Sequence, residues 1–288
     1  LPGTLARVQA QRHAMPRILH ASDLHLGKPF GGFPGDLPAR LRLARAEALD
    51  RLAAAARQGG AAHVLLAGDT FDAETPAPAT LRQALNAMGA AGDIRWWLLP
   101  GNHDSLAATE LWRGLARDAP GNVVALVDPA PVMVEDGLAL LPAPLTARRP
   151  GRDVTEALSA PTPEGAIRLG LAHGRITDFG QDDDPGVIPP DRAARSGLDY
   201  LALGDWHGRL RVDGRAWYSG TPEADSFKHA GPAGALCVDL PGAGLPPRVA
   251  PVTTGALSWM AATLDLLPGE DAAARFLALL PPRAARAA

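Results

Sequence analysis

The 288-residue sequence predicts an α/β protein in which a mostly parallel sheet is followed by a second sheet. In the first 120 residues, apolar runs of strand length alternate with stretches of helical periodicity, the pattern of strands joined by crossover helices. After Pro120, short apolar runs are separated by turns, and only short helices fit between them. Polar side chains also follow the ends of five apolar runs, where α/β proteins place their chemistry.

The first half should contain three strands and three helices. Pro38 can occupy the first turn of a helix, and apolar residues at helical spacing continue that helix until Gly59 and Gly60 end it. The expected strands cover 17–21, 63–67 and 96–99, and the expected helices cover 38–57, 80–88 and 106–117.

The second half should form a largely antiparallel or mixed sheet that packs against the first. Its short apolar runs are bounded by turn residues. The expected strands cover 123–127, 132–135, 138–141, 167–172, 198–203, 216–219 and 235–240, with short helices near 154–158 and 191–196. Beyond residue 251 we expect a strand at 257–266 and a helix at 271–280.

Composition sets limits on the function. Apolar residues make up 47% of the chain, enough for a sizeable core, and the net charge of −3 gives no overall nucleic-acid signature. The single Cys237 excludes an internal disulfide and suits a reducing compartment, so we expect a cytoplasmic protein. No apolar stretch approaches the ~20 residues of a membrane span, and no membrane association is expected. Residues 1–14 are interpreted as a leader or an added extension outside the fold.

Five strand-end loops carry Asp, His or Asn side chains in one order along the chain. Each loop alone has an ordinary alternative as a turn or a core histidine, so the ordered set is the stronger signal. These donors without thiolates suit divalent Mn, Fe, Zn or Mg. The five blocks are Asp23-Leu24-His25, Gly68-Asp69, Gly101-Asn102-His103-Asp104, His173-Gly174 and Gly204-Asp205-Trp206-His207.

This order resembles the calcineurin-like metallophosphoesterase superfamily, whose pattern is D-x-H, G-D, G-N-H-[DE], a lone H and G-H-x-H. Four blocks match as they stand; in the fifth, Asp205 replaces the usual His. The resemblance spans about residues 16–220 and implies a four-layer α/β/β/α sandwich. It implies a catalytic domain over 15–255 and a C-terminal extension over 256–288. That extension is either the start of a smaller capping domain or a strand and helix of the core.

The resemblance also implies roles for these side chains. One metal ion would be held by Asp23, His25, Asp69 and His207, and a second by Asp69, Asn102, His173 and Asp205. We expect two divalent ions, Mn²⁺ first, with Mg²⁺, Fe²⁺ or Zn²⁺ as alternatives. Two-metal hydrolases hold their ions ~3.5–4 Å apart and convert a bridging water to hydroxide.

Three of these side chains carry further expectations. His103 would protonate the leaving oxygen or steady the transition state, and Asp104 would orient its ring and raise its pKa through a hydrogen bond. Asp205 adds negative charge, which predicts a weaker Lewis acid at the second metal and a shift towards Mn²⁺ or Mg²⁺. Alternatively, Asp205 turns away and that metal binds loosely.

Two segments, 22–28 and 217–223, resemble SbcD-type DNA repair exonucleases, so the leading hypothesis is a metal-dependent DNA nuclease. Such enzymes work with an SMC-like ATPase and often form homodimers. A small-molecule phosphodiesterase, such as a cyclic-nucleotide hydrolase, and a metal-binding scaffold without catalysis are the alternatives. The rings of Phe30 and Phe33 would either stack on bases or pack in the core. The candidate phosphate contacts are Lys28, Arg175, Ser219 and Thr221.

Overall fold

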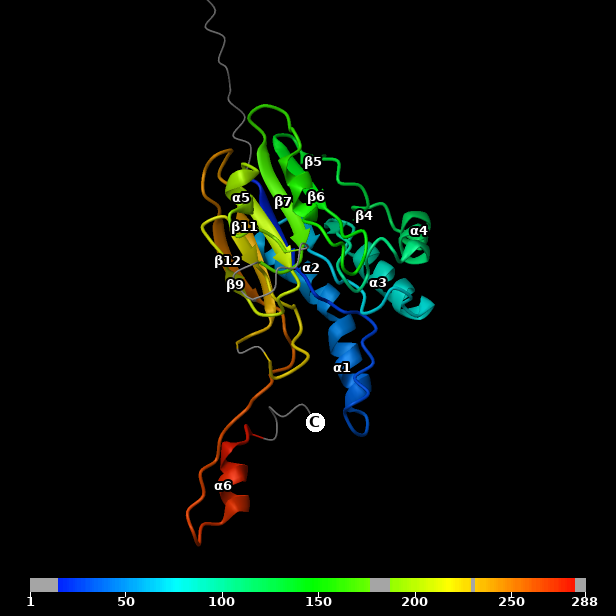
Figure 1. Cartoon of the computed structure of the whole chain (residues 1–288). Coiled ribbons are helices and arrows are strands. Elements are labelled where there is room, and N and C mark those ends of the chain that lie inside the picture. The colour runs from blue at the N-terminus through cyan, green and yellow to red at the C-terminus, as the bar shows by residue number, and fades with distance from the viewer. Residues whose placement is uncertain (1–14, 177–186, 229–230, 283–288) are drawn as a thin grey trace, which may run out of the picture.

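The computed structural model describes residues 15–176, 187–228 and 231–282. Two six-stranded sheets pack face to face, and helices cover the outer face of each, which confirms the predicted four-layer α/β/β/α arrangement (Figure 1). The expected leader at 1–14 lies outside the described residues.

The first sheet has the order β12-β11-β1-β2-β3-β4. The four strands from β1 to β4 run parallel, whereas β11 pairs antiparallel with β1, placing Arg17 opposite Asp239. The strands are β1 (Arg17–Ala21), β2 (His63–Leu66), β3 (Arg95–Leu98), β4 (Val123–Ala125), β11 (Gly234–Asp239) and β12 (Arg248–Thr253).

The second sheet has the order β5-β6-β7-β8-β10-β9. Its four central strands are parallel, and only the two edge strands pair antiparallel. The strands are β5 (Val132–Glu135), β6 (Leu138–Ala143), β7 (Ile167–His173), β8 (Tyr200–Gly204), β9 (Leu210–Arg211) and β10 (Ala216–Tyr218).

Most of the helices lie on the outer faces of the two sheets. The layer on the first sheet contains α2 (Ala48–Gly59), α3 (Pro78–Ala90) and α4 (Thr109–Asp118), and α1 (Leu37–Ala46) packs against α2. The second sheet carries the 3₁₀-helix η1 (Val154–Ser159) and α5 (Arg192–Arg195).

Successive side chains of a strand point to opposite faces of its sheet, and this alternation creates three apolar layers. In β1, Leu19 packs towards the helices, whereas its neighbour Ile18 packs between the two sheets. Trp96 and Trp97 divide in the same way on β3, and both are buried. A third apolar cluster lies between the second sheet and its helices. The two sheets are therefore locked together by a shared interior.

Four expectations were wrong. The helix expected over 38–57 is two helices, which meet at Glu47. Strands β4 and β11 belong to the first sheet, because they pair with β3 and β1. The strand β12 was not expected. No strand is assigned over 257–266, where the amides of Ala256 and Leu257 donate to the Glu223 carboxylate.

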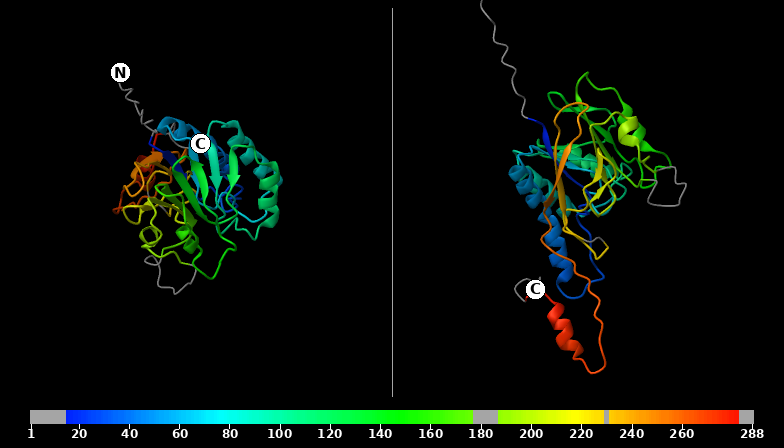
Figure 2. Two further views of the ribbon diagram at one scale, coloured as in Figure 1. Left: turned by 90° about the horizontal axis from the view of Figure 1, so that it is seen from above. Right: turned by 90° about the vertical axis from the view of Figure 1, so that its left-hand side faces the viewer.

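The C-terminal segment leaves the body of the molecule after β12 and ends in α6 (Ala272–Leu279), close to the expected helix (Figure 2). None of the side chains of α6 is buried. Across the described ranges, the helices are too short or too polar to cross a bilayer.

Candidate metal centre

The loop after β1 supplies the first two candidate ligands. Asp23 and His25 both adopt left-handed backbone conformations, with φ of 56° and 44°, which non-glycine residues seldom occupy. The conformation is held by hydrogen bonds from Asp23 N to Gly68 O at 3.1 Å and from His25 N to Asp69 O at 2.9 Å. Backbone strain of this kind concentrates at functional sites.

The loops after β2 and β3 approach their neighbours too closely for larger residues. Gly68 has a φ of +88°, and a Cβ there would lie 2.3 Å from His173 Nδ1. A Cβ on Gly101 would lie 2.2 Å from Asp69 Oδ1. The two glycines therefore allow Asp69 and His173 to approach one another at the junction of the two sheets.

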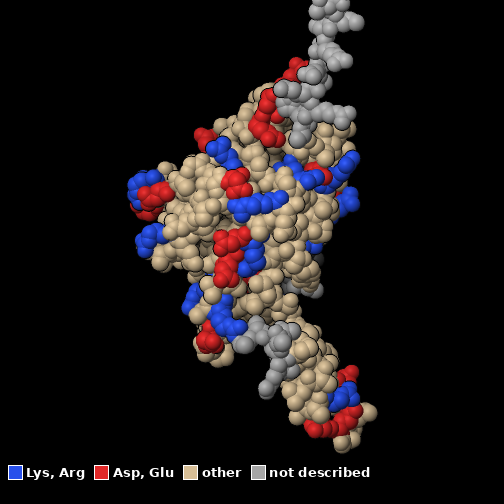
Figure 3. All heavy atoms as spheres, turned by 180° about the vertical axis from the view of Figure 1, so that it is seen from behind, with Lys and Arg blue, Asp and Glu red and all other residues tan. Residues whose placement is uncertain are grey.

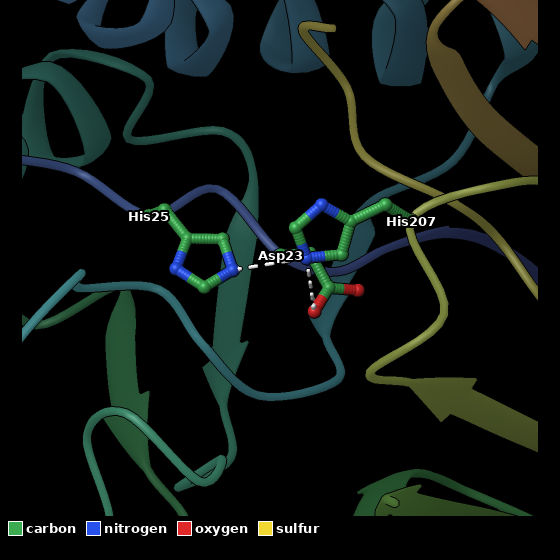
Figure 4. Close-up of side chains that lie close together, drawn as sticks. All are labelled: Asp23, His25 and His207. Carbon is green, nitrogen blue, oxygen red and sulfur yellow. Dashed lines mark hydrogen bonds and ion pairs between the residues drawn. The ribbon is translucent and has the colours of Figure 1, made fainter. Parts of the chain in front are cut away.

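Asp23, His25 and His207 form one candidate ligand group (Figure 4). The Nε2 atoms of His25 and His207 are 3.2 Å apart, and His207 Nε2 lies 3.8 Å from Asp23 Oδ1. Asp23 and His25 are almost completely buried. Because His207 follows β8 and Asp23 follows β1, each sheet contributes to this group.

A second group gathers around His173 at the end of β7. His173 Nε2 lies 3.5 Å from Asp69 Oδ2 and 3.8 Å from Asp205 Oδ1. Asn102 Nδ2 lies 3.4 Å from the same Asp205 oxygen. Asp205 therefore faces the group instead of turning away, and its φ of 101° is a further strained conformation at the site.

These residues fit a pair of metal ions. Asp69 Oδ2 lies 3.6 Å from His25 Nε2 in the first group and 3.5 Å from His173 Nε2 in the second, the place of a bridging carboxylate. His173 Nε2 and Asn102 Oδ1 are buried without a hydrogen-bond partner. Buried polar atoms are rarely left unpaired, and a cation would satisfy both. The donors are oxygen and imidazole nitrogen, as Mn, Fe, Zn and Mg accept.

The clustered charges shift pKa values in opposite directions. Burial alone would raise the pKa of Asp23, but the imidazoles of His173, His207 and His25 outweigh it and leave the pKa below its usual value. Burial alone would lower the pKa of His173, but three carboxylates, Asp69 first, raise it to about 9. Imidazoles must lose a proton to bind a metal, so metal binding here competes with protons.

His103 stands beside the first group. Its ring meets the His25 ring edge-on, with centroids 4.7 Å apart, and its Nδ1 lies 2.8 Å from the carbonyl oxygen of Asp72. With Nδ1–H donated to this carbonyl, Nε2 is left for chemistry. His103 also forms a candidate ligand group with His25 and Asp69.

The expected hydrogen bond between Asp104 and the His103 ring is wrong. The Asp104 carboxylate accepts from Gly101 N at 2.7 Å and from Phe71 N at 3.0 Å, so it shapes the loop. Burial and the nearby charge of Asp69 raise the pKa of Asp104 to about 7. Asp72, which the sequence pattern did not indicate, lies next to both rings: its carbonyl pairs with His103 Nδ1, and its carboxylate lies 3.2 Å from His25 Nδ1. Its only sequence signal is its position three residues after Asp69.

Asp225 is a second residue that the sequence analysis missed. Its Oδ1 lies 3.9 Å from His207 Nδ1, and its Oδ2 accepts from Lys28 Nζ and lies 3.2 Å from Arg45 Nη2. Buried Arg45 on α1 also donates to the carbonyls of Asp23 and Leu24. Asp225 therefore links the β1 loop to His207, as carboxylates commonly do behind metal-binding histidines.

Two predicted phosphate contacts have other partners. Buried Ser219 is 3.0 Å from Ser22 Oγ, which donates to Asp23 Oδ2, and buried Thr221 donates to the carbonyls of Asp23 and Glu223, both at 2.9 Å. These hydroxyls support the Asp23 loop, and their contact with phosphate stays a prediction. Lys28 pairs with Asp225, and Arg175 is exposed just beyond β7.

The profile of the calcineurin-like phosphoesterase family matches residues 16–230. The chain therefore belongs to this family of metal-dependent phosphoesterases, which use a dimetal centre. The site described above supplies candidate residues for such a centre.

Among individual proteins, the chain is similar to the uncharacterized metallophosphoesterase YhaO of Bacillus subtilis, with 25% identity over 237 residues. The match covers 77% of this chain but only 57% of YhaO, so the chain spans little more than half the length of that relative. One solved structure superposes with a TM-score of 0.52 at 11% identity, over 83% of this chain and 99% of the other, which shows a shared fold. Yfce, a phosphoesterase from E. coli, gives a TM-score of 0.35 at 18% identity, over 77% of this chain and 88% of the other.

Proposed function

We propose that this phosphoesterase is a DNA nuclease that hydrolyses phosphodiester bonds at strand ends or in single strands. The observation that carries the proposal is a contact between the two segments that resemble SbcD-type exonucleases. Ser22 meets Ser219 at 3.0 Å, and Thr221 donates to the Asp23 carbonyl at 2.9 Å. Just beyond the second segment, Asp225 pairs with Lys28 of the first. Segments almost 200 positions apart in sequence thus form one wall of the candidate metal centre.

The chain would hold the ions through the seven donors described above. When bound, two divalent ions supply Lewis-acid activation of a water molecule and neutralise charge on the phosphoryl oxygens. We propose Mn²⁺ as the natural ion, because four of the donors are carboxylate or amide side chains. The seven proposed ligands are Asp23, His25, Asp69, Asn102, His173, Asp205 and His207.

His103 would act as the general acid. Its Nδ1–H is donated to the Asp72 carbonyl, so the proton given to the leaving oxygen comes from Nε2. After the P–O bond breaks, the ring is neutral and regains its proton from solvent. Asp69 Oδ1 accepts from the backbone N–H of His103 at 2.8 Å, which ties the acid to the proposed bridging carboxylate.

Attraction of a polyanion must depend on local groups. On the face shown in Figure 3, basic and acidic side chains are interspersed and no field of one sign covers that face. This agrees with the net charge of −3. Lys28 at the edge of the site is the proposed phosphate contact on the β1 side, and exposed Arg175 is the proposed contact beyond β7. An SMC-like ATPase partner, a homodimer and a cytoplasmic location remain predictions.

The test is an assay of the full chain with Mn²⁺ on end-labelled single- and double-stranded DNA. Cyclic AMP and bis(4-nitrophenyl) phosphate serve as small-molecule comparisons. We expect DNA cleavage that is lost in His103→Ala and retained in His63→Gln, whose ring lies on β2 beside Trp97. Rapid hydrolysis of cyclic AMP without cleavage of any DNA would refute the nuclease assignment in favour of a small-molecule phosphodiesterase. Failure on every substrate with Mn²⁺ bound would favour a scaffold.

A further inference from the structure

Three aromatic rings from distant parts of the chain meet beside the candidate metal centre, and we call Phe33, Phe227 and Trp259 the aromatic surface. The Phe33 and Trp259 ring centroids are 5.6 Å apart, and Phe227 meets Trp259 edge-on at 4.9 Å. Phe227 is 62% exposed, so its ring is open to solvent. The Phe30 ring is buried, so it packs in the interior and is not open to stack on a base.

The aromatic surface is fixed in place by hydrogen bonds. Trp259 Nε1 donates to the Ala224 carbonyl at 3.0 Å. The amides of Ala256 and Leu257 donate to the two carboxylate oxygens of buried Glu223, at 2.7 and 3.1 Å. These bonds hold the C-terminal segment against the loop that carries Phe227. The rings are therefore arranged before any ligand arrives, which reduces the entropic cost of binding.

The aromatic surface adjoins the groups that hold the candidate ligands. Phe227 lies two residues beyond Asp225, and two residues span at most ~7 Å. Asp225 itself lies 3.9 Å from His207 Nδ1 and accepts from Lys28. Lys28 Nζ stands 5.7 Å from the Phe30 ring centroid. The Lys28 ammonium group is thus paired with Asp225, two residues before Phe227, and is a candidate contact for a phosphate next to the scissile bond.

We propose that the aromatic surface stacks on a nucleobase of the strand whose phosphodiester bond enters the metal centre. The proposal rests on the nuclease function proposed above and adds how the substrate is recognised. Every nucleobase has a π-face, so stacking on Phe227 would bind any base and favour unpaired bases over paired ones. It would also explain why a large apolar ring is left exposed next to a site for a charged ester.

The test compares two substrates that differ only in their bases. One is a single-stranded oligonucleotide, and the other has the same length but carries abasic tetrahydrofuran residues around the scissile bond. We expect Phe227→Ala to raise KM about five- to hundredfold on the strand with bases, the usual range for losing one stacking contact. The kcat on that strand and both constants on the abasic strand should stay unchanged. Phe227→Tyr should behave as the wild type, since it keeps the ring.

The matched control is Leu267→Ala, which trims another exposed apolar side chain on the C-terminal segment, 70% exposed. It should leave all four constants unchanged. Equal losses on both substrates in Phe227→Ala would overturn the stacking proposal and indicate a structural role or a protein-binding surface, as would no loss on either. If the wild type cleaves neither strand but cleaves bis(4-nitrophenyl) phosphate, the nuclease function fails first, and this proposal fails with it.

Discussion

Replacing Asp225 with Asn should weaken metal binding although Asp225 is not itself a proposed ligand. The substitution removes the negative charge that faces His207 Nδ1 at 3.9 Å and Arg45 Nη2 at 3.2 Å. Losing such a carboxylate behind a metal-binding histidine typically costs about 10- to 100-fold in metal affinity or activity, or about 1.4–2.7 kcal/mol. Arg45 and Lys28 also lose their shared partner, so the free energy of unfolding should fall by about 3 kcal/mol or more.

The assay must separate these two effects. Mn²⁺ affinity is measured by calorimetric titration of the folded protein. Activity is measured as hydrolysis of bis(4-nitrophenyl) phosphate, and stability is measured by urea unfolding. The matched control is Asp239→Asn, which removes the partner of Arg17 on β11. It should leave Mn²⁺ affinity unchanged. An Asp225→Asn protein that is less stable but binds Mn²⁺ within twofold of the wild type would refute the positioning role.

Three further outcomes are expected. Asp205→Asn should lower Mn²⁺ content or activity; a variant with both ions and full activity would show that Asp205 is not a ligand. His103→Ala should lower kcat by about 10²–10⁴-fold while both Mn²⁺ ions stay bound, and loss of an ion by mass spectrometry would make His103 a ligand instead. Burial lowers the pKa of His20 in the folded protein to about 3. As the pH falls below about 6.5, this side chain therefore takes up a proton in the unfolded chain but not in the folded protein. The free energy of unfolding then drops by up to about 1.4 kcal/mol per pH unit. In urea unfolding at pH 7 and pH 5, the stability advantage of the wild type over His20→Gln should therefore shrink, and an advantage equal at both pH values would contradict the account.

The strand ends were predictable because local sequence carries their signal. A buried run followed by Gly-Asp or Gly-Asn-His-Asp defines both the end of a strand and the group placed there. Parallel pairing of β1 with β2 and of β2 with β3 then brings the first three blocks to one edge. The structure also brings His173, Asp205 and His207 to this edge from the second sheet.

The errors concern contacts that local sequence does not encode. Strand β11 reads like any other apolar run, and only its pairing with β1 assigns it to the first sheet. Asp104 is next to His103 in the sequence, yet its carboxylate accepts hydrogen bonds from the backbone amides of Gly101 and Phe71 instead of the His103 ring. Asp225 follows no strand end, and its importance arises from the approach of Lys28 and Arg45.

The pairing of β11 with β1 also constrains when the first sheet can be completed during synthesis. Strand β1, which leads into Asp23, gains its neighbour on one side only after more than 200 further residues have been synthesised. A chain cut at residue 230, where the family match ends, would leave an unpaired β-edge beside the loop that carries Asp23 and His25, and such edges pair with other chains. Fragments trimmed to that boundary should therefore aggregate during translation, whereas chains that continue through β12 should remain dispersed.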